Sequence, residues 1–311
     1  MEYRQLGNSG VRVSAIGLGT NQFGGKIDQT SANTIIGEAL DLGINFIDTA
    51  DMYQSGRSEE TLGIALQGRR RDVVLATKVY MKVGDGPNDR GASRYHIVRG
   101  VEDSLRRLQT DHIDLYQMHR WDENTPIEET LRALDDLLSS GKISYIGTSN
   151  YAAWQIARAN LLAEFRGWNA FVTEQGHYHM LERAVEKEML PFCRSQNVGF
   201  IPFFPLAGGF LTGKYKRGEG APEGSRGERS AYVQAYMSDA NYAIVEKLSA
   251  WSAERGHTIN ELAHAWLLAQ PQVCSVISGL TKIEHMRANA KAADWSLSAE
   301  EEQAVRTILT S

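Results

Sequence analysis

Cysteine is scarce in this sequence of 311 residues, which contains only Cys193 and Cys274. Two cysteines far apart in the chain do not form the closely spaced sets that indicate a disulfide framework. We therefore expect a protein of the reducing cytoplasm rather than a disulfide-stabilised secreted one.

The sequence also lacks long apolar runs and any excess of positive charge. No stretch reaches the roughly 18 apolar residues of a membrane-spanning helix, and the opening residues MEYRQLGNSGVRVS lack the apolar core of a signal peptide. The formal net charge is −5, and a negatively charged protein does not attract nucleic acid. We expect no membrane and no nucleic-acid partner, while the choice between monomer and homo-oligomer stays open.

Strand-like and helix-like segments alternate along the chain. After a short hairpin at residues 3–5 and 11–13, eight segments rich in Val, Ile or Phe have the composition of buried parallel strands. They occupy residues 15–18, 45–48, 73–78, 113–118, 143–149, 171–174, 199–203 and 273–277. Segments with helical periodicity lie at 31–42, 93–108, 126–138, 152–165, 184–195, 259–269, 283–293 and 298–310.

Strands that alternate with helices in this way predict an α/β fold, a (β/α)8 TIM barrel with an N-terminal β-hairpin and a C-terminal helix. We expect a single domain over residues 1–311, because barrels of this length are often one domain. An open, doubly wound sheet is the alternative. Its dinucleotide fingerprint would follow the first strand, where GLGTNQFGG has Gln22 in place of the third glycine. Two long loops, at 80–92 and about 215–234, are expected to cover ligands.

Polar residues stand at or just beyond the ends of three successive predicted strands. Asp48 ends INFID, Lys78 ends VVLATK and His119 ends IDLYQMH, while Tyr53 follows Asp48 in the next loop. Each has an ordinary explanation in packing, but a lysine that ends a buried strand needs a counter-charge, which Asp48 can supply. Because strand ends meet at the rim where barrel enzymes build their sites, the four residues together favour catalysis.

These residues have the chemistry to protonate a carbonyl oxygen. A phenol with a reference pKa of about 10 is a poor acid at neutral pH, and we expect the Lys78 ammonium to lower the pKa of Tyr53. Asp48 would keep Lys78 charged, and His119 would orient the carbonyl and assist the proton transfer. No evident nucleophile is present, so the reaction that fits is proton donation coupled to hydride delivery by a cofactor.

At this point the sequence resembles the aldo-keto reductases, and among them the bacterial branch similar to the potassium-channel β subunits. The resemblance covers nearly the whole chain. It rests on DTADMYQSGRSEETLG, with Gln54 where glycine is more usual, and on LYQMHRWDENTPIEETLRALDDLLSSGKISYIGTSN, PFFPLAGGFLTGKY and VISGLTKIEHMRANAKA. It implies that Asp48, Tyr53, Lys78 and His119 form a catalytic tetrad with Tyr53 as the acid. It also implies an NADP(H)-dependent oxidoreductase that reduces small aldehydes or ketones, including sugars.

The resemblance further implies a dinucleotide site on the same rim. Ser149, Asn150 and Gln175 are implied to hydrogen-bond the nicotinamide carboxamide, and Phe203 to stack on its ring. GGFLTGKY lacks the Ser or Thr that follows the lysine of a P-loop, so ATP is not expected. The expected cofactor-binding residues are Gly19, Thr20, Asn21, Asp48, Ser149, Asn150, Gln175, Phe203, Phe204, Pro205, Leu206, Gly208, Lys214, Arg226, Gly279, Thr281, Lys282, His285 and Asn289.

The resemblance gives weaker evidence for the choice between NADP(H) and NAD(H) than for the dinucleotide site itself. Relatives selective for the 2′-phosphate often carry Arg or Gln at the position of His285, and here Lys282 and Arg287 supply the fixed charge nearby. The resemblance favours NADP(H), and NAD(H) is the alternative.

Further residues of the sequence are candidates for contact with a substrate or a metal. The candidates for substrate contact are Phe23, Tyr53, Tyr80, His119, Arg120 and Trp121. No carboxylate or cysteine completes a metal set with His177 and His179, so no metal is expected. Two rival functions remain: a regulatory protein of the channel β-subunit type that binds the cofactor and docks a partner, and a lyase that forms a Schiff base through Lys78.

Overall fold

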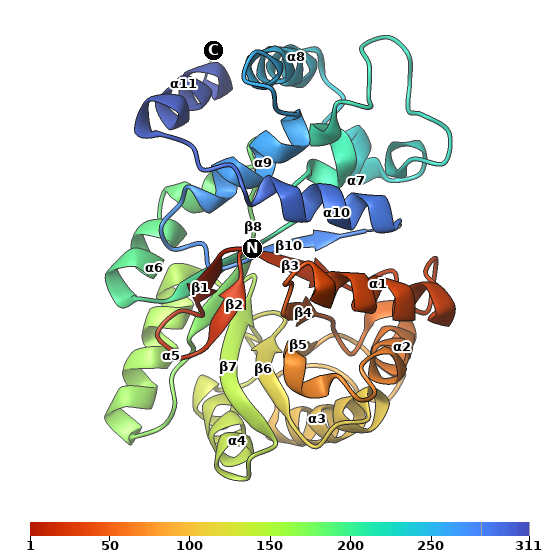
Figure 1. The fold of residues 1–311 in the computed structure, drawn as a ribbon. Coiled ribbons are helices and arrows are strands. Elements are labelled where there is room, and N and C mark those ends of the chain that lie inside the picture. Colours follow the sequence, from red (N-terminus) through yellow and green to blue (C-terminus); the bar gives the residue numbers. More distant parts are fainter. Residues whose placement is uncertain (281, 311) are drawn as a thin grey trace.

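Eight parallel strands close into a barrel at the centre of the molecule (Figure 1). The structure is a computed structural model that describes residues 1–280 and 282–310. The strand order around the barrel is β10-β3-β4-β5-β6-β7-β8-β9. The strands span Ile16–Gly19 (β3), Phe46–Asp48 (β4), Val74–Val79 (β5), Ile113–Met118 (β6), Ile143–Ser149 (β7), Thr173–His177 (β8), Gly199–Phe203 (β9) and Val276–Gly279 (β10). The predicted (β/α)8 barrel is confirmed.

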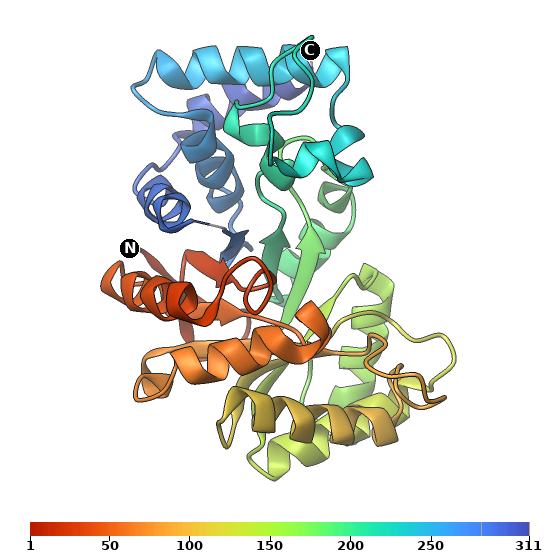
Figure 2. The same cartoon turned by 90° about the vertical axis from the view of Figure 1, so that its right-hand side faces the viewer.

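Helices follow the strands and cover the outside of the barrel, as the two views in Figures 1 and 2 show. The covering helices are Gln29–Asp41 (α1), Arg57–Ala65 (α2), Arg94–Leu108 (α3), Ile127–Ser139 (α4), Ala153–Arg166 (α5), Met189–Gln196 (α6), Ile259–Leu268 (α9) and Ile283–Ala292 (α10). The remaining helices are Ala231–Gln234 (α7), Asp239–Ala253 (α8) and Ala299–Leu309 (α11). Short 3-10 turns lie at Tyr53–Gly56 (η1), Arg70–Asp72 (η2), Ala184–Glu186 (η3), Ala207–Thr212 (η4) and Arg226–Glu228 (η5).

The N-terminal hairpin, Tyr3–Gln5 (β1) and Arg12–Ser14 (β2), closes the amino-terminal end of the barrel. Its Leu6 and Val13 are fully buried and join one apolar cluster with residues from the strands, among them Phe46 and Leu115. Gly7 makes this approach possible, because its φ is +54° and a Cβ there would lie 1.9 Å from the carbonyl oxygen of Val172. The ligand-binding end of the barrel is therefore the opposite one, where the strands end.

Several predicted boundaries differ from the structure. The helix expected at 184–195 is divided into η3 and α6, and Pro191 lies in the first turn of α6, where its missing N–H costs nothing. Helix α1 starts before Ser31, because the carboxylate of Asp28 accepts from the Ser31 backbone N–H at 2.8 Å and caps the helix. Helices α2, α7 and α8 were absent from the predicted set.

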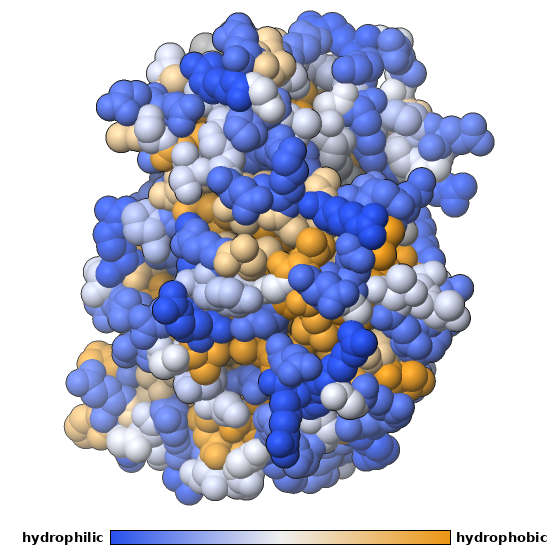
Figure 3. Space-filling model, in the orientation of Figure 1, coloured by the Kyte–Doolittle hydropathy of each residue, from blue (hydrophilic) through white to orange (hydrophobic). Residues whose placement is uncertain are grey.

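Polar and charged residues dominate the face shown in Figure 3, with apolar residues in patches between them. Within the described parts of the chain, no helix is both long and apolar enough to cross a membrane. Cys193 and Cys274 are buried free thiols, and burial raises the pKa of both, which keeps them in the thiol form.

Truncation of Leu6 tests the role of the hairpin. Leu6→Ala should lower the free energy of unfolding by about 2–5 kcal/mol, because it leaves a cavity in the closed end of the barrel. Leu161→Ala is the matched control: Leu161 lies on α5 with 69% of its surface exposed, so it should change stability by less than about 0.5 kcal/mol. Urea denaturation measures both. Equal losses in the two variants would show that the hairpin is not part of the core.

Candidate active site

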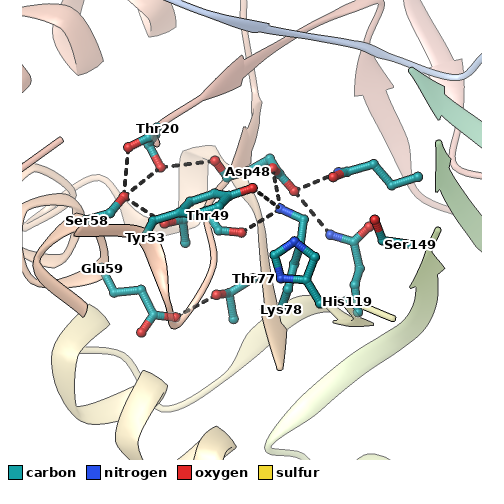
Figure 4. Close-up of polar contacts among 12 residues, drawn as sticks. Thr20, Asp48, Thr49, Tyr53, Ser58, Glu59, Thr77, Lys78, His119 and Ser149 are labelled. Atoms are coloured by element: carbon teal, nitrogen blue, oxygen red, sulfur yellow. Dashed lines mark hydrogen bonds and ion pairs between the residues drawn. The ribbon is translucent and has the colours of Figure 1, made fainter. Parts of the chain in front are cut away.

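A buried ion pair lies at the ligand-binding end of the barrel. The Lys78 ammonium, on β5, donates to Oδ2 of Asp48, on β4, at 2.6 Å. The same ammonium donates to the backbone oxygen of Thr49 at 2.8 Å and to Oη of Tyr53 at 3.4 Å, as Figure 4 shows. Lys78 is 0% exposed. A cation that is buried away from water is stable only where it is paired with an anion and hydrogen-bonded. The oxygen atoms of Asp48, Thr49 and Tyr53 meet this requirement for Lys78.

The other carboxylate oxygen of Asp48 is held by two amide side chains. Gln117 on β6 donates to Oδ1 at 3.1 Å, and Gln175 on β8 donates to it at 2.9 Å. Gln175 was predicted only as a cofactor residue, and Gln117 was not predicted at all. A signal for Gln117 exists in the sequence, because alternate residues of a strand share a face and it stands two positions before His119.

Burial alone would lower the pKa of Lys78, but the adjacent Asp48 and Tyr53 outweigh it and the pKa is raised. Lys78 therefore stays protonated at neutral pH.

Tyr53 stands at the start of a turn with left-handed backbone. Gln54, Ser55 and Gly56 have φ values of 52°, 58° and 89°. Such a conformation costs roughly 1–2 kcal/mol at each non-glycine residue, so tertiary contacts must hold it. One of them is the hydrogen bond from Nε2 of Gln54 to the backbone oxygen of Asn21 at 2.9 Å. Glycine at position 54 would lack this bond, so Gln54 compensates for its own backbone strain.

A second buried pair braces the turn from behind. Glu59 on α2 accepts from Nε of Arg107 on α3 at 2.7 Å and from Oγ1 of Thr77 at 2.6 Å. Thr77 is the residue before Lys78, so this pair ties α2 and α3 to the strand that carries the lysine. Both carboxylate oxygens of the nearby Asp51 lack a hydrogen-bond partner among the described residues. Burial, with the charge of Glu59, raises the pKa of Asp51 well above its usual range and favours its neutral form.

Tyr53 and His119 face each other edge to face, with ring centroids 6.0 Å apart. Lys78 lowers the pKa of Tyr53, as expected, but the net shift is in the other direction. Burial raises this pKa above 10, and the opposing charge of Lys78 does not compensate. The phenol is therefore protonated at neutral pH and has a proton to give.

His119 is held neutral. Burial, Lys78 and Arg120 together lower the pKa of His119 to about 3. Its Nδ1 is buried and makes no hydrogen bond within the described part of the chain. A neutral imidazole beside the phenol can hydrogen-bond a substrate oxygen without carrying charge.

A cavity of about 780 Å³ opens from these residues along the rim. Every expected cofactor-binding residue that the structure describes lines it, and Thr281 lies outside the described residues. The sequence did not identify a further group of lining residues, which comprises Lys26, Gly209, Thr212, Gly224, Ser225, Asn260, Ile277, Ser278, Leu280 and Ala288.

The cavity has the groups that a dinucleotide needs. Lys214, Arg226 and Lys282 supply positive charge for phosphates. Three buried oxygens that line the cavity, on Asn21, Ser225 and Asn260, have no hydrogen-bond partner among the described residues. Buried polar atoms are normally bonded, so a ligand is expected to satisfy them. Gly208 and Gly209 also have φ values of +67° and +105°, and their bare backbone lets a ligand approach closely.

The long segment after β9 is pinned to the barrel by a chain of hydrogen bonds. Tyr232 bonds Nε2 of His177, Tyr236 bonds Tyr232 at 2.9 Å, and Nε2 of His179 bonds Tyr236 at 3.2 Å. The ring of His177 also stacks on Phe203, with centroids 5.3 Å apart. These contacts hold the segment that carries Arg226 beside the cavity. Among the described residues, no group of three metal-ligating side chains is brought together.

The candidate substrate residues line two different cavities. Tyr53 and His119 line the large cavity. Tyr80, Arg120 and Trp121 line a second cavity of about 300 Å³, and Arg120 and Asn150 line both cavities. Phe23 does not belong with them. Its side chain is 1% exposed and packs in the core, so the rim-loop position expected from the sequence does not bring it to the site.

Comparisons with known proteins agree with this geometry. Residues 15–310 match the Aldo/keto reductase family. The chain belongs to that family. It is 43% identical to the uncharacterized oxidoreductase YrpG of Bacillus subtilis, over 96% of this chain and 93% of that protein. It is 39% identical to a probable voltage-gated potassium channel subunit beta of Arabidopsis thaliana, over 94% and 92%. It is 34% identical to the versiconal hemiacetal acetate reductase of Aspergillus parasiticus, over 91% and 90%. The chain is accordingly an oxidoreductase by family.

The protonation of His119 in this aldo-keto reductase can be measured directly. Because its pKa is about 3 when folded and about 6.5 when unfolded, its contribution to stability is complete above pH 6.5. That contribution is lost as the pH falls toward 3. NMR of the imidazole ring, assigned with His119→Gln, should show no protonation between pH 8 and pH 5. A ring that titrates near 6.5 would contradict the burial and the charges described here.

Proposed function

We propose that the protein is an NADP(H)-dependent reductase that converts aldehydes or ketones to alcohols, with Tyr53 as the general acid. The observation that carries this proposal is the Lys78 ammonium, which joins the carboxylate of Asp48 to the hydroxyl of Tyr53 at the cavity wall. A phenol in contact with a permanent buried cation is suited to lose its proton when a carbonyl oxygen becomes basic.

Each residue of the tetrad has one task. Tyr53 gives its proton to the carbonyl oxygen, and Lys78 stabilises the phenolate that remains. Asp48 keeps Lys78 charged, and neutral His119 orients the oxygen toward the phenol. When bound, the dinucleotide supplies the hydride for the carbonyl carbon.

The preference for NADP(H) over NAD(H) is supported by the charge around the adenosine end. Lys214 and Lys282 both act on His285, and burial together with these two cations lowers the pKa of that histidine. A 2′-phosphate would find two lysines there, while Asp48, the only carboxylate among the described residues that line the cavity, is paired with Lys78 at the catalytic end. Neutral His285 adds no charge, so NAD(H) remains the alternative.

A regulatory role is the second candidate. It is supported by the 39% identity to the probable potassium channel subunit beta of Arabidopsis thaliana. The presence of Asp48, Tyr53, Lys78 and His119 favours catalytic turnover, but a protein can reduce carbonyls and also bind a partner protein. Tight binding of NADPH without reduction of any carbonyl would favour this role.

Tyr53→Phe tests the proposed acid. The variant keeps the ring but loses the proton, so kcat for aldehyde reduction should fall by about 10²- to 10⁴-fold. NADPH oxidation in the presence of a panel of aldehydes, ketones and sugars measures this. The control is cofactor binding: titrations should show that both proteins bind NADPH equally well, and more tightly than NADH. Turnover that survives in Tyr53→Phe would exclude Tyr53 as the acid.

A further inference from the structure

Positive charge is in excess along the large cavity. Among the described residues that line it, Asp48 is the only carboxylate, and it is paired with Lys78. The cations that line it are Lys26, Arg120, Lys214, Arg226 and Lys282. A dinucleotide accounts for part of this charge, because its phosphates need counter-charges.

Arg120 is separate from the cations of the cofactor site. Lys214 and Lys282 lie near His285, and the guanidinium of Arg226 lies over the ring of Phe204, 5.8 Å from its centroid. Arg120 instead follows His119 directly and is close enough for its charge to act on that imidazole. Its charge is therefore available at the catalytic end.

The guanidinium of Arg120 is also uncommitted. It makes no hydrogen bond or ion pair with any described residue, although Asp122 and Glu123 line the second cavity with it. Asp122 has other partners, because it accepts from the backbone N–H of Ala92 and Asn124 and from Oγ1 of Thr125. An arginine that is left unpaired between two cavities offers a forked set of N–H donors.

Hydrogen-bond donors gather around Arg120 in the second cavity. Gln155 uses its Oε1 to accept from the backbone N–H of Ala152 at 2.8 Å, and its amide N–H groups have no partner among the described residues. The Tyr80 hydroxyl, which lines the same cavity, has no partner among the described residues. Two carboxylates oppose an anion here: Asp122, whose oxygens already accept three hydrogen bonds, and Glu123, which is exposed to solvent. Donors around a fixed cation match an oxyanion, which accepts from all of them.

We propose that the substrate is an anionic carbonyl compound whose carboxylate or phosphate is bound by Arg120 in the second cavity, which shares Arg120 and Asn150 with the large cavity where His119 lies. This inference rests on the proposed reductase function and adds the substrate class to it. Both groups are oxyanions that accept the two parallel N–H bonds of a guanidinium. Neutral hydroxylated aldehydes are the competing class, because Glu123 could accept from their hydroxyls.

Matched pairs of aldehydes test the proposal. One pair is 4-oxobutanoate and its methyl ester, and the other is glyceraldehyde 3-phosphate and glyceraldehyde. In at least one pair, kcat/KM of the wild-type protein should be at least about tenfold higher for the anionic member, mainly through KM. This preference should weaken with rising salt, because Arg120 is exposed and its charge is screened.

Arg120→Gln should bring the preference close to one, and Arg120→Lys should keep part of it, because lysine retains the charge without the fork. Arg71→Gln is the matched control. Arg71 is exposed on η2, at the start of β5 and thus at the opposite end of the barrel, so its loss should leave the preference intact. Calorimetric titration with succinate adds a readout without turnover, and Arg120→Gln should weaken its binding by at least about tenfold.

The outcomes separate the two proposals. Preference in one pair only identifies the oxyanion as carboxylate or as phosphate. Equal turnover of charged and neutral members by the wild type overturns the anionic substrate and leaves the reductase standing. A preference that persists in Arg120→Gln, or that is also lost in Arg71→Gln, overturns the role of Arg120. No reduction of the four aldehydes, where other members of the carbonyl panel are reduced, overturns this inference alone. No reduction of any carbonyl in the panel or of the four aldehydes overturns the reductase function and this inference with it.

Discussion

The Lys78–Asp48 ion pair is the interaction on which the site depends. Burying two charges costs several kcal/mol per ion, and a pair survives inside a protein only where its remaining polar groups are also bonded. The barrel meets this condition with the backbone oxygen of Thr49 and the amides of Gln117 and Gln175. These groups come from different sides of the closed sheet. The charge of Lys78 thus depends on barrel closure, and in the proposed mechanism the acidity of Tyr53 depends on that charge.

The polar groups on one side of the Lys78–Asp48 pair are hydrogen-bonded within the protein, and several on the cavity side are not. Behind the pair, Glu59 and Arg107 fix the helices that support the strained turn after Tyr53. In front of it, Nδ1 of His119, Oδ1 of Asn21 and the guanidinium of Arg120 lack hydrogen-bond partners within the described chain. A rigid frame with unsatisfied groups on one side is prepared for ligands, because little has to rearrange when they bind.

Much of the barrel could be predicted because buried parallel strands are continuous apolar runs. The predicted strands at 113–118, 143–149 and 199–203 match β6, β7 and β9. The strand expected at 171–174 is displaced to Thr173–His177, because TEQGH is polar and its Gln175 donates to Asp48 and lines the cavity instead of packing in the apolar core. The division of the helix at 184–195 follows from Pro191, a local signal that the helical periodicity concealed.

The sequence allowed prediction of the site residues that end strands, but not of the contacts between residues that are distant in the chain. Asp48, Lys78 and His119 stand out because polar residues end apolar strands. The Glu59–Arg107 pair joins residues 48 positions apart on two helices, and no local pattern indicates it. The lowering effect of Lys78 on the pKa of Tyr53 was predicted, but the larger, opposite effect of burial was not, because the sequence shows the neighbouring charge and not the depth of burial. The burial of Phe23 escaped prediction for the same reason.

A double-mutant cycle between Lys78 and Tyr53 tests the central claim most directly. If Lys78 acts through the phenol, Lys78→Met and Tyr53→Phe should each lower kcat/KM strongly, and the double variant should be no slower than Tyr53→Phe alone. NADPH binding and urea denaturation establish that all three variants are folded and bind the cofactor. If the two losses multiply instead, Lys78 and Tyr53 act independently, and the buried ion pair does not control the acid.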